Sequence, residues 1–139
     1  MEIRCPGATA IGTAAIRDYQ LMFKGSKTGS YLTIEQSKGA SVPVGVWQVD
    51  HTHEQSLDVY EGYPSFYYKV EMPIMCIDFS GQARKLKAFV YIMDERRHLA
   101  LPSDAYVRTC SQGYRDFGLD LSKLKEAYKI SLKGSHCEI

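Results

Sequence analysis

The segment Leu57–Pro64, with the sequence LDVYEGYP, holds the carboxylate in this chain with the strongest case for chemistry. Gly62 is expected to end a short helix, which places Glu61 in its last turn. The helix macrodipole puts partial negative charge there, so an anion is disfavoured. The dipole, with burial under neighbouring aromatic rings, is expected to raise the pKa of Glu61 toward the range useful for general acid–base catalysis. The alternative is a solvated carboxylate beside a C-cap glycine.

The helix that carries Glu61 is predicted from its own start signals. Thr52 is followed three residues later by Gln55, the spacing of a capping box. Leu57 and Tyr60 supply the apolar stripe of the helix. An aromatic strand is expected to begin directly afterwards, at 66–68.

Composition and charge limit the class of protein. The chain has 139 residues, of which 45% are hydrophobic and 24% charged, and its net charge is +1. These values are typical of one soluble globular domain over residues 1–139. The low net charge gives no indication of a nucleic-acid or anionic-membrane partner. No apolar run is long enough to span a bilayer, and Met1 leads into a polar segment instead of a signal peptide.

Neither the cysteines nor the histidines form a recognisable metal or redox motif. Four scattered cysteines lack Cys-x-x-Cys spacing and are expected to be reduced thiols of a cytoplasmic protein. His51 and His53 have a spacing that some metal sites use, but they span a helix start and no third ligand is evident, so no metal is expected. Residues 24–29 lack the residue order of a phosphate-binding loop.

The expected order of elements is strands first and helices last. The predicted strands are 8–16, 19–23, 31–35, 43–49, 66–77 and 84–93, and the last two form a hairpin around Ser80–Gly81. A loop is expected at 24–29 and a solvated charged loop at 94–98. Ser103 is expected to cap a helix that ends at Gly118, with an inward face of Tyr106, Val107, Cys110, Tyr114 and Phe117. Asp120 is expected to cap another helix with Leu121, Leu124 and Tyr128 inward. The fold class is α+β with a mainly antiparallel sheet.

Several of these segments, taken together and in order, resemble the γ-glutamylcyclotransferase-like superfamily, which includes γ-glutamylamine cyclotransferases and avirulence-induced plant homologues. The resemblance runs through most of the chain. It rests on 4–8 (RCPGA), 42–47 (VPVGVW), the pattern Leu57-Asp58-x-x-Glu61-Gly62-x-Pro64-x-x-Tyr67, 88–91 (AFVY) and the pattern Pro102-Ser103-x-x-Tyr106. The fold that it implies is a small, partly closed β-barrel with flanking helices.

The activity implied by the resemblance is cyclisation of a γ-glutamyl group to 5-oxoproline, with release of an amine or amino acid. In this family the glutamate that matches Glu61 is the catalytic acid/base, and the tyrosine that matches Tyr106 lies near the substrate pocket. Tyr67, Tyr63, Trp47 and Tyr91 are the further residues expected to line a cavity at Glu61. The reaction needs a small γ-glutamyl substrate and no metal or organic cofactor.

One departure from the family pattern concerns the N-terminus. Relatives open with a strand and a Tyr-Gly-Ser-Asn-type loop whose amides hold the γ-glutamyl end of the substrate, whereas Met1 here coincides with a point after that loop. The single domain is therefore expected to be N-terminally incomplete relative to the family. An exposed sheet edge is then expected to drive homo-oligomer formation, and activity is expected to be weak without the donors of the loop. The alternative to an enzyme is a catalytically deficient protein of the same fold that binds a small molecule or a partner subunit.

Overall fold

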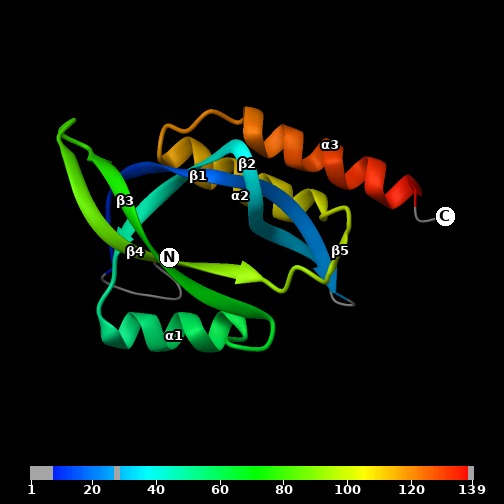
Figure 1. The fold of residues 1–139 in the computed structure, drawn as a ribbon, viewed down its shortest axis with the longest axis horizontal. Coiled ribbons are helices and arrows are strands. Elements are labelled where there is room, and N and C mark those ends of the chain that lie inside the picture. Colours follow the sequence, from blue (N-terminus) through cyan, green and yellow to red (C-terminus); the bar gives the residue numbers. More distant parts are fainter. Residues whose placement is uncertain (1–7, 27–28, 138–139) are drawn as a thin grey trace. The chain divides into compact units, whose positions relative to one another are not determined.

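A computed structural model describes residues 8–26 and 29–137 (Figure 1). Within these residues the elements are β1 (Thr9–Ser26), β2 (Gly29–Gln48), α1 (His51–Glu61), β3 (Tyr67–Asp78), β4 (Ala83–Met93), β5 (His98–Leu99), α2 (Asp104–Asp116) and α3 (Ser122–Cys137). The strand order is β2-β1-β3-β4, and β5 pairs with β1. Pairing of β3 with β1 and β4, and of β5 with β1, is antiparallel, which confirms the predicted α+β class.

The chain divides into two compact units. The first consists of Met1–Ala15 and Val44–Asp94, and the second of Ile16–Pro43 and Glu95–Ile139. The long strands β1 and β2 each run from one unit into the other. The assignment of 1–139 to a single domain stays a prediction. No helix among the described residues has the length and apolar character needed to cross a bilayer.

The first two strands are longer than expected. Residues 9–16 and 19–23 belong to one strand of 18 residues, which continues through 24–26, where the sequence predicts a loop. Residues 31–35 and 43–48 belong to one strand of 20 residues. The polar residues between the predicted pieces do not end the strands. Asp18 adopts φ 63° and Gly39 adopts φ 86°, and the Asp18 carboxylate accepts a 3.0 Å hydrogen bond from the Gly39 amide. Locally left-handed residues change the direction of a chain without ending its pairing, which explains the difference.

The predicted hairpin of the first unit is confirmed. β3 and β4 pair in register from Tyr67 with Met93 to Ile77 with Ala83. At the turn, the Asp78 carboxylate accepts hydrogen bonds from the amides of Ser80 and Gln82, at 3.0 and 2.9 Å. The inner face of the hairpin contributes Ile74 and Cys76 to a core that also contains Ala14 and Val46.

Helix α1 begins earlier than the sequence suggested. Its N-cap is Asp50, not Thr52, because the Asp50 carboxylate accepts a 2.8 Å bond from the His53 amide. The His53 ring completes the capping box, because its Nδ1 accepts a 3.1 Å hydrogen bond from the Asp50 amide. Aspartate is among the best N-cap residues, so it displaces the threonine two positions later. The predicted end is confirmed: Gly62 is the C-cap, with φ 67°.

The second unit contains α2 and α3. Ser103 caps α2 as predicted. Its hydroxyl accepts a 3.1 Å hydrogen bond from the Tyr106 amide. The expected inward face of α2 is half-buried, and α2 contains no fully buried residue. At the start of α3, the Asp120 carboxylate accepts a 2.7 Å hydrogen bond from the Ser122 amide. Leu124, on the predicted inward face of this helix, is buried. The 3.6-residue periodicity therefore gives the orientation of both helices correctly, but it overstates how deeply α2 is covered.

Candidate functional site

Glu61 is the last residue of α1, and its side chain is half-buried. The helix ends directly after Glu61, at the C-cap Gly62. The Gly62 amide donates to the Val59 carbonyl at 3.2 Å, and the Tyr63 amide donates to the Asp58 carbonyl at 2.9 Å. This is the αL-type ending that glycine permits. The turn that carries Glu61 is therefore well defined by its own main-chain bonds.

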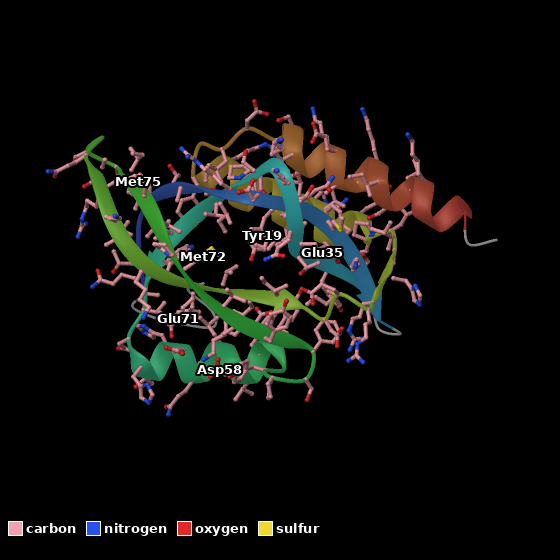
Figure 2. All side chains as sticks on the ribbon, viewed as in Figure 1. Tyr19, Glu35, Asp58, Glu71, Met72 and Met75 are labelled. Carbon is pink, nitrogen blue, oxygen red and sulfur yellow. The ribbon has the colours of Figure 1, made fainter. Side chains whose placement is uncertain are left out.

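A network of polar side chains connects α1 to the β3–β4 hairpin. The Tyr91 hydroxyl on β4 donates a 2.6 Å hydrogen bond to Asp58 Oδ1. Lys69 Nζ on β3 lies 2.9 Å from Asp58 Oδ1 and donates to Oδ2 at 3.1 Å. The same ammonium group donates to Glu54 Oε2 at 2.6 Å. Figure 2 shows Asp58 on α1, below the strand that carries Glu71.

Aromatic rings surround the lysine of this network. Lys69 Nζ lies 4.6 Å from the centre of the Tyr63 ring, 5.7 Å from that of Phe89 and 6.0 Å from that of Tyr91. The Phe89 and Tyr91 rings also meet edge to face, with centroids 5.7 Å apart. The electron-rich faces of such rings attract a cation. The ammonium group is thus held both by carboxylates and by ring faces.

The network moves the pKa values of Asp58, Lys69 and Tyr91 away from neutral pH. The Tyr91 hydrogen bond, followed by the Lys69 contacts, lowers the pKa of Asp58, although partial burial opposes this. The hydrogen bonds to Glu54 and Asp58 raise the pKa of Lys69. Burial raises the pKa of Tyr91 most, and the Asp58 hydrogen bond and the charges of Asp58, Glu54 and Glu61 add to the rise.

The other residues predicted for the site have varied surroundings. In the first unit, Tyr63 is 42% exposed, Tyr67 is buried with its ring against Phe66, and Trp47 is half-buried in β2. Tyr63 and Tyr91 come together at Lys69. Tyr106 belongs to the second unit, where its hydroxyl accepts the Leu32 amide at 3.0 Å. A cavity at Glu61, lined by these aromatic residues, stays a prediction.

The histidines of α1 serve local structure. The His53 ring is part of the capping box, and the His51 ring lies 3.2 Å from the Gln55 amide nitrogen, one turn along the helix. Across 8–26 and 29–137, no three histidine, cysteine, aspartate or glutamate side chains gather in a way that could hold a metal ion.

With this geometry established, comparison with known proteins identifies the family. The family described as "Gamma-glutamyl cyclotransferase, AIG2-like" matches residues 2–108. The chain belongs to this family. The match includes α1 and the whole β3–β4 hairpin, and so covers Glu61 and the Asp58 network.

Solved structures agree with this membership. An uncharacterized human protein is 28% identical over 91% of this chain and 76% of its own, with a TM-score of 0.76. A structure named gamma-glutamyl cyclotransferase gives 27% identity, the same coverage and the same TM-score. A protein from Arabidopsis thaliana, at 16% identity and TM-score 0.53 over 83% of this chain and 76% of its own, shares the fold. No curated protein matches the sequence.

Sequence reasoning missed the partners of Asp58. Asp58 belongs to the motif that carries the family resemblance, but the sequence analysis predicts no role for it and none for Glu54 or Lys69. A signal was present: Glu54 and Asp58 are four residues apart on the predicted helix and therefore share one face. Two carboxylates on one helix face predict a cationic partner, although the sequence does not say which lysine or arginine supplies it.

Proposed function

We propose that this chain cyclises the γ-glutamyl group of a small γ-glutamyl amine or peptide to 5-oxoproline and releases an amine or amino acid. The observation that carries the proposal is the position of Glu61, half-buried as the last residue of α1 and three residues after Asp58, in a chain of the AIG2-like γ-glutamyl cyclotransferase family. Glu61 acts as the general acid/base.

The reaction is an intramolecular acyl transfer. The α-amine nitrogen of the γ-glutamyl group attacks its own γ-carbonyl carbon, so a carbon–nitrogen bond forms and a five-membered lactam closes. The bond from that carbon to the leaving nitrogen then breaks. Because nucleophile and electrophile are in one molecule, the protein mainly has to select the reactive conformer. The α-ammonium nitrogen loses two of its three protons as it becomes the lactam N–H, and the leaving nitrogen gains two as it departs as an ammonium group. Glu61, as base and then as acid, carries these protons from the first nitrogen to the second.

The charge states around Glu61 support its role. Asp58, Lys69 and Tyr91 all have pKa values moved away from neutral pH, so near neutrality they stay an anion, a cation and a neutral hydroxyl. Groups that keep one protonation state give Glu61 a constant electrostatic environment through the proton transfers.

Substrate contacts are proposed for the aromatic residues of the resemblance. Tyr63 is the most accessible of them, at 42% exposure, and follows Glu61 by two residues. The Tyr91 hydroxyl donates its proton to Asp58, so the proposed contact of Tyr91 with the substrate is made by its ring. The remaining proposed contacts are Tyr67, Trp47 and Tyr106.

The test is release of 5-oxoproline from a panel of γ-glutamyl amines and γ-glutamyl amino acids. Glu61→Gln keeps the size of the side chain but removes its ability to carry a proton, so turnover is expected to fall by about 100- to 10,000-fold. Glu71→Gln is the matched control, because Glu71 is an exposed β3 carboxylate paired with Lys87 at 2.9 Å. Equal turnover in both variants would remove Glu61 from the mechanism. Binding of γ-glutamyl compounds without any release of 5-oxoproline would instead indicate a catalytically deficient binding protein.

Location in the cell and assembly are two further proposals. Cys76 and Cys110 are free thiols, as expected of a cytoplasmic protein, and we propose that location. Association into a homo-oligomer also stays a proposal, which light scattering of the purified chain tests: a monomer at micromolar concentration would contradict it.

A further inference from the structure

The last turn of α1 is anchored at Asp58 through both its side chain and its main chain. The carboxylate binds the Tyr91 hydroxyl and the Lys69 ammonium group, at 2.6 and 2.9 Å to Oδ1. The carbonyl accepts the Tyr63 amide at 2.9 Å. Glu61 lies between Asp58 and Tyr63 in sequence, so both ends of the short segment that carries it are attached to Asp58.

Lys69 is part of the same contact between α1 and the β3–β4 hairpin. Its ammonium group is bound by Glu54 and Asp58 and faces the Tyr63 ring, and its side chain is 17% exposed. Two of the three donors of this ammonium group are already used on Glu54 and Asp58, and the face of the Tyr63 ring lies 4.6 Å away. The geometry therefore favours a supporting role for Lys69 over substrate binding.

We propose that Asp58 is a positioning residue: it fixes the helix turn that carries Glu61 against β4, with Tyr91 and Lys69 as its anchors. The catalytic consequence rests on the proposed function. Asp58 itself touches no reacting atom in this mechanism. Asp58 stays ionised and Tyr91 stays a donor near neutral pH, so the hydrogen bond between them persists there.

The first experiment measures the anchor without any need for turnover. Amide hydrogen exchange is followed at Gly62 and Tyr63 in the full chain and in Asp58→Asn and Tyr91→Phe. Both variants keep the size of the side chain, and each weakens one side of the contact. We expect exchange at these two amides to become about 10-fold faster, as in a local opening of the turn, while amides in the middle of the β3–β4 ladder keep their rates. Glu71→Gln, on the same hairpin, is expected to change the exchange rate neither at Gly62 and Tyr63 nor in the middle of the β3–β4 ladder.

Unchanged exchange at Gly62 and Tyr63 in both Asp58→Asn and Tyr91→Phe would overturn the proposal. Uniformly faster exchange over the whole chain would also overturn it, because that result indicates a general loss of stability instead of a local anchor. The two amides report the position of the helix turn in either case.

The second experiment measures the consequence for catalysis. A displaced acid/base affects the chemical step, so Asp58→Asn is expected to lower kcat by about 10- to 100-fold and to change KM by less than about threefold. Asp58→Asn and Tyr91→Phe disrupt the same contact, so the double variant is expected to lose no more kcat than the worse single variant. An unchanged kcat in Asp58→Asn, in a chain where Glu61→Gln abolishes turnover, would overturn the positioning role and leave the proposed function intact. Absence of turnover in the unmodified chain would count against the proposed function, while the exchange experiment would still decide whether Asp58 anchors the turn.

Discussion

The hydroxyl of Tyr91 donates a 2.6 Å hydrogen bond to Oδ1 of Asp58, and this bond ties β4 to α1 three residues before Glu61. The two residues are 33 positions apart in the chain. A charge-assisted bond between a phenol and a carboxylate is stronger than a neutral one, and Lys69 pairs with the same carboxylate at 2.9 Å. The position of the proposed acid/base therefore depends on a tertiary contact as well as on its own helix.

The Asp58 network predicts a pH-dependent contribution to stability. The pKa of Asp58 is lower in the folded chain than the ordinary value of 3.8, so its contribution is present above pH 3.8 and is lost as the pH falls through the lower folded pKa. At pH 7, Asp58→Asn is expected to lower the free energy of unfolding by about 1 kcal/mol, since the network is partly exposed. Denaturant titrations at pH 7 and pH 2.5 measure the difference, which is expected to be smaller at the lower pH. A difference that grows on acidification would contradict the direction of the shift.

The C-cap glycine of α1 gives a second prediction. Gly62 has φ 67°, and an added Cβ would lie 3.1 Å from the Cβ of Phe66. Gly62→Ala is expected to lower the free energy of unfolding by about 1–2 kcal/mol, because a left-handed conformation is unfavourable for residues with a Cβ. The control is Gly113→Ala in α2, where nothing lies within 4 Å of the added carbon. This substitution is expected to stabilise the chain by up to about 1 kcal/mol, because alanine is the better helix former. Thermal or denaturant unfolding of both variants distinguishes them, and changes of the same sign would be unexpected.

The contact between β1 and β3 gives a third prediction. At Gly12, which pairs with Asp78, an added Cβ would lie 2.2 Å from the Ile77 carbonyl oxygen and 2.9 Å from Cys76 Sγ. Backbone atoms cannot move aside as a flexible side chain can. Gly12→Ala is therefore expected to cost about 1–3 kcal/mol of folding free energy, the range found for overpacked cores. Equilibrium unfolding against the unmodified chain measures this cost, and a neutral effect would mean that the two strands separate readily at this position.

The sequence predicts local features of this fold well and tertiary ones poorly. The hairpin over β3 and β4, the Gly62 ending of α1 and the Ser103 cap of α2 all follow from short-range chemistry, and all are confirmed. For each of the two long strands the sequence predicts two shorter pieces, and in the first strand the gap between them is at 17–18. Continuity there depends on the Gly39 amide, which lies 21 residues away and cannot be recognised from local sequence.

The candidate site shows the same division. Glu61 follows from a motif and a helix end, both of which are local. Its surroundings need Lys69 and Tyr91, which reach α1 only because the register of the hairpin pairs these two residues with each other. Side-chain alternation puts directly paired residues on the same face of a sheet. The sequence predicts the two strands and the turn of this hairpin, but not which of its faces α1 covers.

Tyr106 gives the last prediction, because its two possible roles have different consequences. In the second unit its hydroxyl accepts a 3.0 Å hydrogen bond from the Leu32 amide. Its ring packs edge to face against the rings of Tyr31 and Phe23, with centroid distances of 5.4 and 6.2 Å. Tyr106→Phe keeps the ring contacts and removes the acceptor, so the free energy of unfolding is expected to fall by about 1 kcal/mol. If Tyr106 also contacts the substrate, KM for γ-glutamyl substrates rises as well, while kcat changes little. Unfolding and steady-state kinetics on the same preparation separate the two roles. A loss of stability with an unchanged KM would limit Tyr106 to structure, and the residue would then leave the proposed substrate site.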